Sequence, residues 1–124
     1  MRRLSAETGR IPQLELADGF VALMNHKARA LGMTDTEFHG VHGLPPSNGR
    51  SDNLSTCNDM IRLAREVLHH PEILNWTSIE QTTFRNGTLA ITNKNKLVGR
   101  VPGVDGLKTG YTRRAGFNIV ATGV

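Results

Sequence analysis

The sequence predicts an α+β fold in which helices come first and antiparallel strands follow. Apolar residues recur at three- and four-residue steps in the first half of the chain, which is the spacing of a helical face. In the second half an Asn86-Gly87 pair, the strongest short-range hairpin signal, separates two short β-like runs. Helices and strands do not alternate, so a parallel sheet built from βαβ units is not expected.

Residues 1–18 show no clear period, and Pro12 argues against one continuous helix there. We therefore expect an irregular N-terminal segment. The apolar spacing from residue 19 to about 31 predicts the first helix, with Asp18 as its N-cap and Gly32 as its C-terminal stop.

A loop rich in Gly, Pro, Asn and Ser follows over residues 32–56. Thr56 and Asp59 form a T-x-x-D signature that begins a second helix. A short helical piece is expected at 72–77. The apolar residues of the second helix that share one side are Met60, Ile61, Ala64, Val67 and Leu68. The short piece is expected to bury Ile73, Leu74 and Trp76.

The strands lie in the last third of the chain. A hairpin is predicted around Asn86-Gly87, and two further strands are predicted at about 105–111 and 117–123. Such a small sheet needs a covering layer, because an isolated hairpin is marginally stable in water. We expect this sheet to lack some of its partners within the chain.

The amino-acid composition argues against a disordered chain, a nucleic-acid-binding protein and a membrane-spanning protein. With 38% apolar and 21% charged residues the chain is typical of a folded globular domain rather than a disordered one. The net charge of +4 comes from scattered Lys and Arg without interleaved aromatic residues, which disfavours nucleic-acid binding. No apolar run is long enough for a membrane span or for the core of a signal peptide.

Neither the histidines nor the single cysteine predicts a metal site. His39 and His42 have H-x-x-H spacing in the loop, but zinc needs further ligands, and no third position stands out. We interpret them as polar loop residues and expect Cys57 to be a small, partly buried residue. His69 and His70 follow the second helix, where a histidine is favoured by the negative end of the helix dipole. Three methionines are expected to fill the core: Met24, Met33 and Met60.

The chemistry is concentrated in one predicted strand, which carries Lys108, Thr109 and Gly110 in succession. Alternation places Lys108 and Gly110 on one face and Thr109 on the other or toward the edge. A glycine inside a strand permits the close approach of a ligand. Lys108 supplies a positive charge, Thr109 a hydroxyl, and Tyr111 a backbone N–H for a developing oxyanion, although an exposed lysine also guards a strand edge against aggregation.

K-T-G belongs with S-x-x-K and S-D-N to the signature set of penicillin-binding proteins and class A β-lactamases. Several segments in order from residue 19 to 124 resemble the serine-type D-alanyl-D-alanine carboxypeptidases, the low-molecular-mass penicillin-binding proteins. They are FVALMNHKARALGMTDTEF, VHGLPP, STCNDMIRLAREVL, HPEILNWTS, FRNGT, NKNKLVGRVPGVDGLKTGYT and AGFNIVATG.

The resemblance implies a helical subdomain beside an antiparallel sheet, with the active site between them, and residues 19–124 as a partial transpeptidase-like domain. It implies a catalytic role for Lys108 in the hydrogen-bond network and substrate-binding roles for Thr109, Gly110 and Tyr111. The Thr109 hydroxyl is expected to hold a substrate carboxylate, and the backbone after Gly110 to contribute to the oxyanion hole. No cofactor and no metal are implied.

The nucleophile that this mechanism needs is missing from the chain. A lysine one helical turn after a serine can act as its base, which is the S-x-x-K arrangement. No serine of this chain has a lysine three residues later; the serines are Ser5, Ser47, Ser51, Ser55 and Ser78. The triplet Ser51-Asp52-Asn53 spells S-D-N, but it follows the HGLPP loop, whereas the family motif precedes the FVALMN-like helix. We interpret it as turn chemistry.

We therefore expect an internal fragment of an enzyme that removes the terminal D-alanine of peptidoglycan stem peptides through an acyl-enzyme. The fragment alone is expected to be inactive. By resemblance the parent protein acts in the cell envelope or periplasm and binds stem peptides and β-lactams. The alternative is a non-catalytic module that binds cell-wall peptide or associates with itself.

Overall fold

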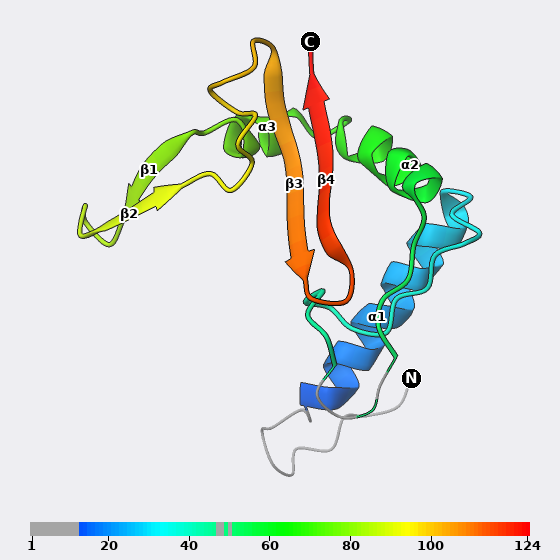
Figure 1. Ribbon diagram of the computed structural model, residues 1–124. Helices are drawn as coiled ribbons and strands as arrows, with labels where there is room; N and C mark the ends of the chain where they lie inside the picture. The colour runs from blue at the N-terminus through cyan, green and yellow to red at the C-terminus, as the bar shows by residue number, and fades with distance from the viewer. Residues whose placement is uncertain (1–12, 47–48, 50) are drawn as a thin grey trace, which may run out of the picture. The chain divides into compact units, whose positions relative to one another are not determined.

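A computed structural model describes residues 13–46, 49 and 51–124 of the 124-residue chain (Figure 1). The chain divides into two compact units, Met1–Thr56 and Cys57–Val124, which we call the N-terminal and the C-terminal unit. No helix among the described residues is both long and apolar enough to cross a membrane. The N-terminal residues up to 12 lie outside the described part.

Helix α1 (Gln13–Ala30) forms the N-terminal unit together with the loop that follows it. It begins six residues earlier than predicted, so Asp18 lies inside the helix and is not its N-cap. The prediction was wrong because proline is compatible with a helix that begins beside it, and Pro12 therefore leaves Gln13 free to be helical. The stop at Gly32 is confirmed, since this residue has a φ of 71°.

The end of α1 is closed by two crossed backbone hydrogen bonds. The N–H of Met33 donates to the carbonyl of Ala28 at 2.9 Å, and that of Gly32 donates to Arg29 at 3.0 Å. This is the Schellman arrangement, which satisfies carbonyls that the helix leaves open and favours glycine at the left-handed position. It turns Met33 into the interior of the unit, where it is buried as predicted, whereas Met24 and Met60 are only half-buried.

Two asparagine side chains hold the long loop in place. Asn25 of α1 brackets Phe38, accepting from its N–H at 2.8 Å and donating to its carbonyl at 2.7 Å. Asn53 accepts from the N–H groups of His39 and Gly40 and donates to the carbonyl of Gly40. The loop therefore has a defined path because its backbone groups find side-chain partners in place of a sheet.

The C-terminal unit starts with α2 (Cys57–Val67) and α3 (Pro71–Thr77). Both helices were predicted, and Pro71 begins α3 at a position that suits proline. Asp59 is fully buried on α2 and pairs with Arg62 at 2.8 Å. Of the apolar residues predicted to share one side of α2, Met60, Ala64 and Val67 are half-buried, whereas Ile61, and Leu68 just after the helix, are exposed.

The strands of this unit form two separate antiparallel pairs. In the first, β1 (Gln81–Phe84) pairs with β2 (Leu89–Thr92) around the predicted Asn86-Gly87 turn, where Asn86 and Gly87 both have positive φ values. In the second, β3 (Val104–Thr112) pairs with β4 (Gly116–Gly123). The predicted hairpin and strands are confirmed to within about two residues at their ends.

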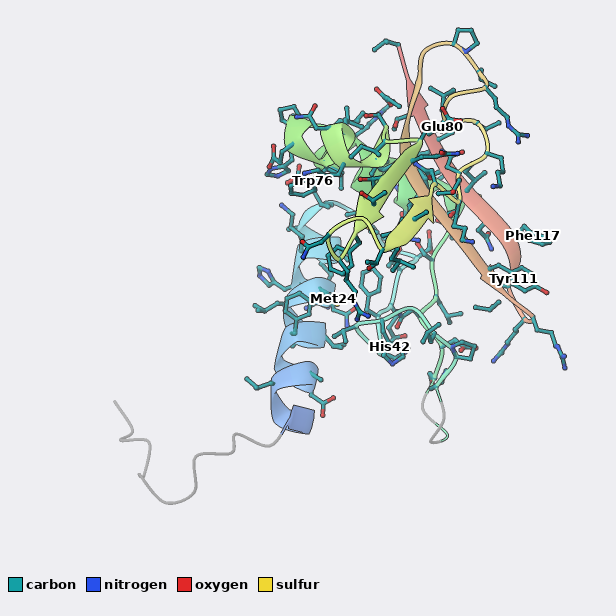
Figure 2. The ribbon with its side chains drawn as sticks, turned by 90° about the vertical axis from the view of Figure 1, so that its left-hand side faces the viewer. Met24, His42, Trp76, Glu80, Tyr111 and Phe117 are labelled. Carbon is teal, nitrogen blue, oxygen red and sulfur yellow. The ribbon has the colours of Figure 1, made fainter. Side chains whose placement is uncertain are left out.

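One face of the β3–β4 pair carries large exposed apolar side chains. Tyr111 lies opposite Phe117, and their ring centroids are 4.4 Å apart (Figure 2). Phe117 is 89% exposed, and Ile119 on the same face is about half exposed. The large apolar side chains at this end of the strand pair are therefore mostly exposed.

A polar loop links β2 to β3 through two further asparagines. The Asn93 amide donates to the carbonyls of Thr77 and Ile79 at 2.8 and 2.9 Å, and its oxygen accepts from the Asn95 N–H. The buried Asn95 amide donates to the carbonyl of Gly106 on β3 at 2.8 Å. The two side chains thus tie the end of α3 to the edge of β3 that β4 does not occupy.

Candidate functional site

All four residues of the predicted site lie in the second half of β3. The register pairs Lys108 with Val120 and Gly110 with Asn118, whereas Thr109 and Tyr111 pair with Ile119 and Phe117. Residues directly opposite each other share a face, so Lys108 and Gly110 lie on one face and Thr109 and Tyr111 on the other. Lys108 and Gly110 are exposed, Thr109 is half-buried, and the Lys108 Nζ donates to the Thr109 carbonyl.

Gly110 leaves open space beside the strand. A Cβ atom at this position would have no heavy atom within 4 Å. The space beside Gly106, four residues earlier in β3, is filled instead, because a Cβ there would lie 2.6 Å from the Thr77 Oγ1. Gly106 is therefore required by packing within the C-terminal unit, whereas the surface at Gly110 is open.

A pocket of about 400 Å³ lies beside Lys108 and Thr109, between α3, β2 and β3. We call it the β3 pocket. One part of its lining is apolar and comes from Trp76, Ile79, Ile91 and Leu107; the polar part includes Lys94, Lys108 and Thr109. The expectation that Trp76 would be buried was wrong, since its side chain is 67% exposed at the end of α3 (Figure 2).

The sequence did not single out Lys94 as a site residue. Its signal was the N-K-N spacing, because asparagines on both sides of a lysine can fix the backbone that carries it. Asn93 and Asn95 do this, since both carboxamides bind backbone groups of the surrounding segments. Lys94 therefore belongs to a fixed loop and lines the pocket together with Lys108.

The other sequence candidates have local structural contacts. The His42 Nδ1 accepts from the N–H of Leu44 at 3.0 Å, and the His39 Nε2 lies 3.6 Å from a Glu37 carboxylate oxygen. Among the described residues no group of three or more His, Cys, Asp or Glu side chains could hold a metal ion. The expectation for Cys57 was wrong, because it is exposed at the first position of α2.

His69 and His70 lie just after α2, as predicted for residues at the negative end of a helix. The His69 Nδ1 lies 3.7 Å from a Glu66 carboxylate oxygen, and the His70 Nδ1 lies 3.5 Å from one of Glu72. Both contacts lie on the surface, the first across one turn at the end of α2 and the second at the start of α3. These histidines thus have acidic neighbours in addition to the helix end.

The triplet Ser51-Asp52-Asn53 lies in the N-terminal unit. The Asn53 side chain makes three hydrogen bonds to the backbone of His39 and Gly40, which are contacts across the long loop and not the local turn chemistry that the sequence suggested. Ser51 lines a hollow of about 320 Å³ beside His39, and none of the described residues that line this hollow is a lysine. The described lining of the hollow thus offers Ser51 no lysine of the kind that S-x-x-K supplies.

Comparison with known proteins identifies relatives over most of the chain. The family model for D-alanyl-D-alanine carboxypeptidases, peptidase S11, matches residues 16–124. The chain is 37% identical over 106 residues to the D-alanyl-D-alanine carboxypeptidase DacD of Escherichia coli, which covers 85% of the chain and 26% of that protein. It is 35% identical over 106 residues to DacF of Bacillus subtilis, covering 83% of the chain and 26% of the relative.

Solved structures of penicillin-binding proteins match the fold of this chain. Penicillin-binding protein D2 of Listeria monocytogenes, in its cefotaxime-bound form, matches with a TM-score of 0.75 and 34% identity, over 85% of this chain and 42% of that one. Penicillin-binding protein 6B of Escherichia coli matches with a TM-score of 0.72 and 37% identity, over 87% and 33%. The helices and antiparallel strands of this chain are therefore part of the penicillin-binding-protein fold.

These matches also show how much of a relative the chain represents. It spans 26% of the length of the two curated carboxypeptidases, and the order of its segments follows theirs. Because the family model matches from residue 16 to the last residue, the resemblance seen in the sequence is confirmed: the chain belongs to the D-alanyl-D-alanine carboxypeptidases of peptidase family S11.

Proposed function

We propose that the chain is part of a serine-type D-alanyl-D-alanine carboxypeptidase and supplies one wall of its active site. The observation that carries this proposal is the β3 pocket, in which Lys108 and Thr109 lie side by side at an unoccupied strand edge. In this proposal residues 19–124 form a partial transpeptidase-like domain. The parent protein acts in the cell envelope or periplasm and binds peptidoglycan stem peptides and β-lactams.

Each site residue has a role that its position can serve. The Lys108 ammonium group helps to organise the catalytic hydrogen bonds, and the Thr109 hydroxyl binds the carboxylate at the end of the stem peptide. Gly110 lets the peptide approach the strand, because nothing lies within 4 Å of where a side chain would begin. The Tyr111 N–H donates to the oxyanion that forms on the attacked carbonyl.

The attacking serine has to come from outside this chain. In the acylation step a serine oxygen bonds to the carbonyl carbon, the peptide C–N bond breaks, and the departing D-alanine nitrogen takes up a proton. Water then cleaves the ester and restores the serine. We therefore expect the isolated chain to form no covalent adduct with a penicillin.

The test is labelling with a fluorescent penicillin. The isolated chain should remain unlabelled, whereas a chimera that places the N-terminal part of Escherichia coli DacD before residue 16 should become labelled. In the chimera, Lys108→Ala should abolish labelling and Lys96→Ala, a change on the loop outside the β3 pocket, should preserve it. Stable labelling of the isolated chain, or a fully active Lys108→Ala chimera, would contradict the proposal.

A second function is a module that associates with itself without chemistry. The observation that favours it is the exposed sheet face at Phe117, together with a β4 strand that contains no charged residue to protect its edge. Sedimentation velocity over a hundredfold range of concentration tests it. A monomer throughout that range would rule this function out.

A further inference from the structure

We propose that the C-terminal unit binds a flexible linear polymer of phosphodiesters that carries no bases. The binding surface consists of three exposed cations, which we call the basic loop surface: Arg85 at the β1–β2 turn, and Lys96 and Arg100 in the loop between β2 and β3. None of the three has a role in the proposed function, so the inference does not depend on it.

Positive charge is concentrated in the part of the chain that carries the strands. Residues 80–124 contain seven of the 15 Lys and Arg but only two of the 11 Asp and Glu, so their net charge is +5, against −1 for residues 1–79. Of the two acids, Asp105 has one carboxylate oxygen buried in the unit, and the Glu80 carboxylate lies against Gly99. The surface of this part therefore attracts anions.

The cations of the basic loop surface have no acidic partner within the described part of the chain. All three are exposed, and none forms an ion pair with a described residue, although Glu80 lies against the same loop. An anion can therefore bind them without first displacing an internal carboxylate. The charge of the ligand is opposite to that of the surface, which makes their contact favourable.

The backbone that carries Lys96 and Arg100 is fixed from inside the unit. Asn95 and Val98 lie between or beside them in the sequence and are each only 5% exposed. The N–H of Arg100 donates to the Leu97 carbonyl at 3.0 Å, which closes a tight turn between the two cations. Because this turn is already formed, little free energy is lost to ordering its backbone when a ligand contacts both side chains.

The spacing of the cations favours a polymer over a single anion. Arg85 follows the four residues of β1, which extend the hairpin by about 13 Å from the end where the loop begins. One phosphate cannot contact both ends of this length, whereas a chain with repeated phosphates can, and guanidinium groups bind phosphate through two parallel N–H donors. Residues 85–100 contain no Phe, Tyr or Trp on which a base could stack.

The test is fluorescence anisotropy of a labelled glycerol-phosphate decamer titrated with the full 124-residue chain. With three phosphate contacts, the affinity should fall about twentyfold between roughly 50 and 200 mM salt, from a slope of about 0.7 per contact. Free glycerol phosphate at the same phosphate concentration should not displace the decamer. A single-stranded thymidylate decamer should bind no more tightly than the glycerol-phosphate decamer, because no ring is placed to stack its bases.

Variants with equal net charge separate this surface from the overall charge. The double variant Lys96→Gln with Arg100→Gln should lower the affinity about tenfold and flatten the salt dependence by about 1.4. Arg29→Gln with Arg65→Gln removes the same charge from exposed positions on α1 and α2 and should lower the affinity less than about twofold. Glu80→Gln removes the acid against the loop and should raise the affinity about twofold.

Four results would overturn the inference. Equal losses from the two double variants would mean that only the overall charge matters, and displacement by free glycerol phosphate would mean a site for one anion. Thymidylate binding more than about fivefold tighter would point to nucleic acid. Stronger binding to phosphatidylglycerol vesicles than to the decamer, at equal phosphate, would point to a membrane surface. None of these results alters penicillin labelling of the chimera, so this inference and the proposed function can fail separately.

Discussion

Replacing Asn95 by alanine should destabilise the C-terminal unit more than any other single amide truncation in the β2–β3 loop. Its side chain is 5% exposed and makes two hydrogen bonds to backbone groups. The amide donates to the Gly106 carbonyl at 2.8 Å, and the oxygen accepts from the Leu97 N–H at 3.0 Å. Alanine leaves both backbone groups without these partners.

The size of the effect follows from where the two backbone groups lie. Gly106 is buried, so its carbonyl stays without a partner, at a cost of about 1–3 kcal/mol. Leu97 is 37% exposed, so its N–H can bind water and its loss should cost only about 0.5–1 kcal/mol. We expect the free energy of unfolding to fall by roughly 1.5–4 kcal/mol in total.

Urea denaturation followed by circular dichroism measures this loss, with Asn118→Ala as the matched control. Asn118 also donates to two backbone carbonyls, those of Ala115 and Gly116, but on the exposed surface. Its truncation should therefore cost less than about 1 kcal/mol. Hydrogen exchange at the Leu97 amide gives a second reading, which should become faster in Asn95→Ala. Equal destabilisation by the two variants would refute the reasoning.

Two more predictions concern packing and charge in the same unit. Gly106→Ala should destabilise it by about 1–3 kcal/mol, because the new Cβ would lie 2.6 Å from the Thr77 Oγ1, whereas Gly110→Ala should change thermal stability little. Similar melting temperatures for the two variants would contradict this. Arg62→Met should lower the urea midpoint, at a cost of roughly 1–3 kcal/mol, because the buried Asp59 carboxylate loses one of its partners, the Arg62 guanidinium at 2.8 Å. An unchanged midpoint would show that the carboxylate does not need the guanidinium.

The local elements could be predicted because their signals are short-range. The Asn86-Gly87 pair specifies the tight turn between β1 and β2, since these residues accept positive φ more readily than others. Gly32 likewise marks the end of α1. The start of α1 was missed because Pro12 was interpreted as a barrier to the residues after it, whereas proline restricts mainly the turn before it.

Burial could not be predicted from periodicity alone. The spacing of Trp76 with its aliphatic neighbours indicated a covered helical face, yet Trp76 is mostly exposed at the β3 pocket. Periodicity identifies which residues share a face but not what lies against that face. The same reason explains Ile61 on α2 and Leu68 just after it, which share the predicted side but remain exposed.

What the sequence by itself determined is the order of the elements, the family and the strand that carries Lys108, because each depends on residues close together in the chain. The tertiary structure alone decided which residues accompany that lysine. Lys94 and Trp76 reach the same pocket only because Asn93 and Asn95 tie α3 to the free edge of β3, through contacts that join residues 11 to 16 positions apart. Such contacts depend on how the elements pack against one another, and the N-K-N spacing by itself does not show which backbone groups the asparagines bind.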